Sequence, residues 1–140
     1  MPIVRMLVAG TAAGVLSILT SWLVTGTLFH RFQALTPATW RPNEGSREYT
    51  ASSAFNLVAT LMLTFLFAAT GGVHAWDLGS PLLNGLLFGV LAWIALALPL
   101  LLSQAVFVNV HRGVTTGLAL DWLLLCLWTG AAAGIVVAGH

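Results

Sequence analysis

Charged residues are what this sequence has least of. Only 6% of its 140 residues are charged, and lysine is absent altogether. A water-soluble domain carries charge on about a quarter of its residues, so five basic and four acidic side chains cannot cover a water-facing surface. Together with a hydrophobic share of 59% and a mean hydropathy of +0.95, this indicates that most of the chain faces lipid.

Motifs for chemistry are also missing. The chain has one cysteine, Cys126, so no intramolecular disulfide can form. It contains no CxxC, no HExxH and no glycine-rich phosphate loop, and its serines, threonines and histidines form no nucleophile–base set. A net charge of +1 gives no electrostatic footprint for nucleic acid. We therefore predict no enzymatic activity, no cofactor, no metal and no nucleic-acid partner.

Long apolar runs take the place of those motifs. A helix needs about 20 apolar residues to cross a hydrocarbon core of about 30 Å. The sequence predicts an all-α, polytopic membrane protein with a single membrane domain over residues 1–140, because short connections make sequential helices antiparallel neighbours. This four-transmembrane-helix antiparallel bundle has predicted spans at 6–29, 51–70, 81–107 and 116–137, with a polar loop at 30–50.

The arginines predict the orientation. With four spans both termini lie on one side, together with Arg5, whereas Arg31, Arg41, Arg47 and Arg112 lie on the other. Because basic residues concentrate in cytoplasmic loops, we expect loops 30–50 and 109–115 to face the cytoplasm. The termini would then lie outside a bacterial inner membrane.

Glycines recur at a spacing of four in three of the spans. Helices in lipid associate through close packing of small residues, so these are predicted packing positions. On a helix with about 100° per residue, the last pair lies opposite Asp121. If Asp121 faces the interior, the last glycine pair faces outward and predicts a homodimer or docking of another membrane subunit. The pairs are Gly10 and Gly14, Gly85 and Gly89, and Gly130 and Gly134.

One acidic residue, Asp121, interrupts the apolar run of the fourth span. It lies about 8 Å inside the span, and polar side chains of the other spans come at a similar level. The predicted cluster comprises Asp121, Asn56, Gln104, Ser103 and Thr25, and the rim above it comprises His30, Arg31, His111 and Arg112. Three deeper tryptophans, Trp22, Trp93 and Trp128, are expected to fill the bundle interior.

Two hypotheses for Asp121 stay open, as does its charge state. An ionisable group inside a membrane is by default a candidate functional site, here for a proton or a small ligand. The structural hypothesis gives Asp121 one interhelical hydrogen bond, with Asn56 as a candidate partner. We favour a structural or accessory membrane protein. The alternative is a small carrier, a channel, or a protein that binds a small or lipid-like ligand in a polar cavity around Asp121.

Three segments resemble a bacterial family of small integral membrane proteins known only as a domain of unknown function. They are SWLVTGTLF (Ser21–Phe29), GLLFGVLAW (Gly85–Trp93) and LALDWLLLCLWTGAAAG (Leu118–Gly134). Members of that family tend to have a Trp-Tyr pair late in the first helix and an amide followed by Gly-Tyr in the fourth. Here Leu23 follows Trp22, and Asp121 stands at the amide position. The resemblance covers nearly the whole chain and implies a four-helix membrane fold without supplying an activity.

Overall fold

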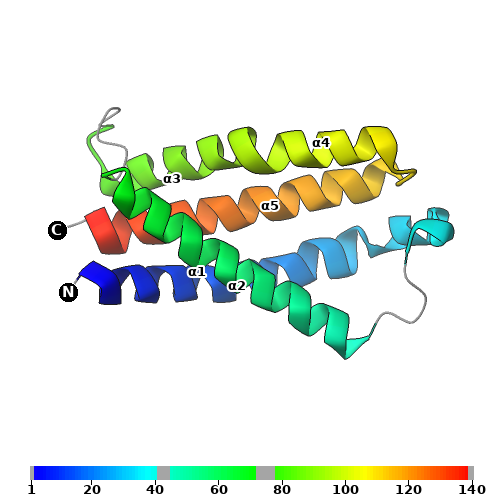
Figure 1. The fold of residues 1–140 in the computed structure, drawn as a ribbon, viewed down its shortest axis with the longest axis horizontal. Coiled ribbons are helices and arrows are strands. Elements are labelled where there is room, and N and C mark those ends of the chain that lie inside the picture. The colour runs from blue at the N-terminus through cyan, green and yellow to red at the C-terminus, as the bar shows by residue number, and fades with distance from the viewer. Residues whose placement is uncertain (1, 41–44, 72–77, 139–140) are drawn as a thin grey trace.

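Four long helical rods lie side by side along the molecule in the computed structural model of the chain (Figure 1). The structure describes residues 2–40, 45–71 and 78–138. Successive rods run in opposite directions, so both termini lie at one end (Figure 1). Each rod is long and apolar enough to cross a membrane. The predicted all-α fold, a four-helix antiparallel bundle of a multi-pass membrane protein, is confirmed.

The rods are built from α-helices interrupted or extended by short segments of other helix types. Their bounds are α1 (Pro2–Leu23) and the π-helical turn η1 (Val24–Leu28), then α2 (Ser46–Ala69), then α3 (Pro81–Ala92), the π-helical turn η5 (Trp93–Ala97) and α4 (Leu98–Phe107), and last α5 (Arg112–Ala133) with the π-helical turn η6 (Gly134–Ala138). The 3₁₀ segments η2 (His30–Leu35) and η3 (Pro37–Thr39) form much of the first connection.

Three helices begin earlier than the apolar runs predict. Helix α1 starts at Pro2 rather than at 6, α2 starts at Ser46 rather than at 51, and α5 starts at Arg112 rather than at 116. The reason is that backbone hydrogen bonding continues into polar residues at the membrane surface, whereas hydropathy marks only the part that suits hydrocarbon. The last residues of the expected polar loop 30–50 therefore belong to the start of α2.

Side chains cap the starts of α2 and α5. The Gly45 N–H donates to Glu48 Oε2 at 3.0 Å ahead of α2, and the Gly113 N–H donates to His111 Nδ1 at 3.0 Å at the start of α5. Each bond satisfies a backbone donor that has no partner within its helix. Helix α2 is followed by Gly71, whose φ of 69° lies in the left-handed region that favours glycine.

Pro99 disturbs the third rod. Proline has no N–H to donate within a helix, and the turn before it is wound as a π-helix, η5. There the Leu98 N–H donates to the carbonyl of Trp93, five residues back. The disturbance therefore takes the form of a π-helical turn between α3 and α4.

Helix α5 lies between α1 on one side and the α3–α4 rod on the other (Figure 1). Its contact with α3 brings two backbones together. A Cβ atom built on Gly85 would lie 2.0 Å from the carbonyl oxygen of Gly130, and one built on Gly130 would lie 2.0 Å from that of Gly85. A Cβ built on Gly89 would likewise lie 2.4 Å from a carbonyl oxygen of the facing helix, and one built on Gly134 would lie 2.2 Å from another. Only glycine leaves space for this approach.

The contact between α1 and α2 uses the glycines of the first span. A Cβ on Gly10 would lie 2.8 Å from the Leu61 side chain, and one on Gly14 would lie 2.7 Å from that of Leu57. The hydroxyls of Thr60 and Thr64 lie on the same α2 face, are fully buried and donate to carbonyls of their own helix.

The expectation that Gly130 and Gly134 face outward is wrong. Both glycines are buried against α3, while other sides of α5 contact α1 and α2. Helix α5 is surrounded by neighbours, so a face opposite Asp121 still lies inside the bundle. The glycine pair is therefore occupied within one chain and offers no free face for a partner.

Candidate functional site

Asp121 joins two helices. Ser21 of α1 donates its hydroxyl to Asp121 Oδ2 of α5 at 3.0 Å. The second carboxylate oxygen, Oδ1, is buried and accepts no hydrogen bond from the described residues. The partner of Asp121 is thus Ser21 and not Asn56, the candidate suggested by the sequence. Asp121 is half-buried at the contact between α1 and α5.

The other members of the predicted cluster do not meet Asp121. Thr25 donates its hydroxyl to the carbonyl of Ser21 at 2.7 Å, within its own rod. Ser103 is exposed. Asn56 and Gln104 line two different grooves. Helix α2 crosses the bundle obliquely, and its first turns diverge from it (Figure 1). The predicted cluster is therefore divided, since Thr25 and Asn56 line the same groove as Ser21, whereas Gln104 lines the other.

One rim residue, His111, takes part in the contact between the first and third connections. The His111 ring stacks on the Phe32 ring with centroids 5.0 Å apart and planes 5° apart. The Arg31 guanidinium lies 5.0 Å from the same Phe32 ring, and Thr39 donates its hydroxyl to the carbonyl of Asn109 at 2.8 Å. His30 lines a groove, whereas Arg112 is exposed at the start of α5. Of the four rim residues, His111 thus contacts the other connection, whereas Arg31 packs on a ring of its own connection.

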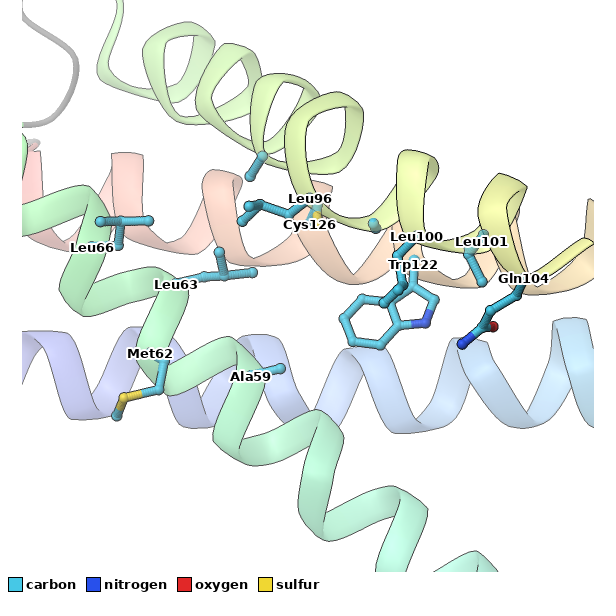
Figure 2. A pocket seen from close by; sticks show the side chains of 12 residues that line it. Ala59, Met62, Leu63, Leu66, Leu96, Leu100, Leu101, Gln104, Trp122 and Cys126 are labelled. Atoms are coloured by element: carbon cyan, nitrogen blue, oxygen red, sulfur yellow. The ribbon is translucent and has the colours of Figure 1, made fainter. Parts of the chain in front are cut away.

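The first groove is apolar and lies between α2 and the α3–α4 rod, with α5 as its floor (Figure 2). Its volume is about 520 Å³. The Trp122 indole lies across the floor, and the Gln104 amide supplies a polar group at one end (Figure 2). The rest of the wall is aliphatic side chains and Cys126. This groove suits the acyl chains of the bilayer.

The second groove lies between the last part of the first rod and the first turns of α2. It has a volume of about 870 Å³ and is lined by both polar and apolar side chains. Trp22 lines it and is 68% exposed. The expectation that Trp22 fills the interior is therefore wrong, since its position on α1 faces this groove rather than α5. We call this feature the α1–α2 groove.

Sequence reasoning identified only part of the α1–α2 groove. It placed Asn56, Thr25 and His30 in a functional region, but not the polar side chains of the first turns of α2. A signal was present, because residues at spacings of three and four share one helix face. That face carries Tyr49, Ser52, Ser53 and Asn56, all of which line the groove.

Among the described residues, no three histidine, cysteine, aspartate or glutamate side chains lie close enough to hold a metal ion. No family model, no curated protein and no solved structure matches this chain.

Proposed function

We propose that this chain is a small structural or accessory protein of a bacterial inner membrane, without catalysis. The observation that carries this proposal is the hydrogen bond between Ser21 and Asp121, which joins α1 to α5. Asp121 itself lines neither described groove, although its partner Ser21 lines the α1–α2 groove. An interhelical hydrogen bond in a membrane stabilises a bundle by about 0.6–2 kcal/mol, and this role accounts for an acid at that position.

The carrier or channel alternative needs Asp121 in a polar cavity. The described grooves separate the residues that such a cavity would combine, because Gln104 lines one and Asn56 the other. We therefore rank this alternative below the structural role. The resemblance to a family of uncharacterised four-helix membrane proteins agrees with an accessory role and remains a prediction.

We also propose that the termini lie outside and that the connections around residues 30–50 and 109–115 lie in the cytoplasm. Arg31, Arg47 and Arg112 belong to the end opposite the termini (Figure 1), and basic residues favour the cytoplasmic side. Reporter fusions test this orientation. A fusion after His140 that reports a cytoplasmic C-terminus would reject it.

An accessory role implies a partner, either a second copy or another membrane subunit. Since the glycine faces are filled within the chain, we expect such a partner to contact lipid-exposed aliphatic faces instead. Light scattering of the purified chain in detergent measures whether it self-associates.

Proteoliposomes distinguish the structural role from transport. The wild type, Asp121→Asn and Asp121→Leu are reconstituted, and proton flux is followed with a trapped pH-sensitive dye. We expect no flux in any of the three, and Asp121→Asn should melt near the wild type because an amide oxygen still accepts from Ser21. Proton flux that disappears in Asp121→Asn would refute the proposal.

A further inference from the structure

We propose that the α1–α2 groove binds one phospholipid whose zwitterionic headgroup carries an ammonium. This inference goes beyond the structural role of the bundle, although the groove shares Ser21 with the contact to Asp121. It rests on the depth of the groove, its unpartnered donors and its charge.

The depth of the groove matches one leaflet. It extends along the first rod from Ile18 past the end of the span at Leu28. Those ten or so residues rise ~15 Å, which is about half of a hydrocarbon core of ~30 Å. The groove therefore begins near the middle of the bilayer and opens at its surface, as a single lipid molecule does.

The lining changes character along this depth. Ile18, Leu19 and Trp22 form the deeper wall on α1, whereas His30, Gln33 and Trp40 come from the end of the rod and the first connection. Apolar walls suit an acyl chain, and polar side chains at the surface suit a headgroup. The volume of about 870 Å³ is within the range of about 300–1,000 Å³ typical of small-molecule sites.

Two donors in the lining lack protein partners. The Trp40 indole N–H is buried and donates to no described residue. The Asn56 amide makes no hydrogen bond with the described residues, although it lies about three turns into a membrane span. A polar group without a partner in lipid is costly. The ester and phosphate oxygens of a phospholipid supply acceptors at these depths.

The charge of the lining selects the headgroup. Among its described residues Glu48 is the one carboxylate, and none is arginine or lysine. Anionic headgroups are recognised by basic clusters, so the groove offers them no favourable partner. Glu48, Trp40 and Tyr49 all line the groove, and an ammonium group binds to both acids and aromatic rings.

Lipid titration of the purified full chain in detergent tests the site. Native mass spectrometry counts bound phosphatidylethanolamine and, separately, bound phosphatidylglycerol as each is added. We expect one saturable phosphatidylethanolamine with a Kd about fivefold lower than that of phosphatidylglycerol, since one charge at a membrane surface contributes about 1 kcal/mol. Equal binding of the two lipids, or only unsaturable uptake, would overturn the proposal.

Asn56→Leu removes the deeper donor and should raise the Kd for phosphatidylethanolamine about fivefold. Gln104→Leu is the matched control, because it removes an amide from the other groove and should leave that Kd unchanged. Ser52→Phe is a second test that fills the groove rather than removing a donor, and it should block binding. An equal loss in Gln104→Leu, or full binding in Ser52→Phe, would assign the lipid to the general apolar surface.

Glu48→Gln tests the headgroup preference by itself. Glutamine still accepts the Gly45 N–H and so keeps the start of α2, but it removes the charge. We expect the ratio between the two Kd values to fall to about one, while phosphatidylethanolamine still binds. An unchanged ratio would show that the carboxylate does not select the headgroup.

Discussion

Helices α3 and α5 touch backbone to backbone, whereas α1 and the first turns of α2 separate and leave an open groove. Glycines stand at the closest points of the first contact, with Gly85 and Gly130 directly opposed. The second region carries hydroxyl, amide and aromatic side chains. Small residues let two helices pack so closely that no lipid enters between them. Polar side chains near the membrane surface need hydrogen-bond partners, which a closed contact would have to supply. The contact between α3 and α5 therefore holds the bundle together, whereas the α1–α2 groove stays open.

The largest expected effect comes from forcing the closed contact apart. Gly85→Leu places a side chain where even a Cβ would lie 2.0 Å from a backbone oxygen. Backbone atoms on a rigid helix cannot move aside singly, so α3 and α5 must separate and the folded chain should be largely lost. Thermal unfolding in detergent, followed by circular dichroism, measures this loss.

Gly26→Ala is the matched control for that substitution. The nearest atom to a Cβ at Gly26 is 3.5 Å away in the Trp22 side chain, which is ordinary van der Waals contact. The melting temperature should stay near that of the wild type. If Gly26→Ala is as harmful as Gly85→Leu, close packing is not what distinguishes the two regions.

A smaller effect is expected at the polar contact between α1 and α5. Ser21→Ala removes the donor to Asp121 Oδ2 and should lower the free energy of unfolding by about 1 kcal/mol. Asp121→Leu removes the same bond, so the two effects should not add in the double variant. Strict additivity in this double-mutant cycle would mean that the bond contributes nothing to stability.

The smallest effect is expected in the apolar groove. Gln104 is exposed at its edge, and its amide makes no hydrogen bond with the described residues. Gln104→Leu should therefore leave the melting temperature unchanged or raise it slightly. A clear drop would indicate that the amide has a partner in the folded bundle.

The fold was predictable because each span is governed by a local quantity. Hydropathy over about 20 residues identifies a span whatever lies next to it, and all four predicted spans match long helices. Helix ends were less predictable, as the early start of α2 at Ser46 shows, because caps such as Glu48 extend helices into polar sequence.

The candidate site was less predictable than the fold. Depth along a helix can be counted from the sequence, and it placed Asp121 and Asn56 at one level. The rotation of each helix about its axis and the angle at which two helices cross cannot be counted in this way. They bring Asp121 into contact with α1 and place Asn56 in the lining of the α1–α2 groove. The same limit explains the wrong orientation of Gly130, since a helix wheel gives relative faces but not the number of neighbours.

The sequence by itself determined that this chain is helical and lies in a membrane, because burial of backbone polar groups and the thickness of the bilayer act on every segment separately. Only the tertiary structure decided which polar side chains meet. The oblique path of α2 sets that outcome, because it closes the bundle at the glycines of α1 and opens it beside Asn56. A crossing angle depends on how two surfaces fit together, and neither surface specifies it alone.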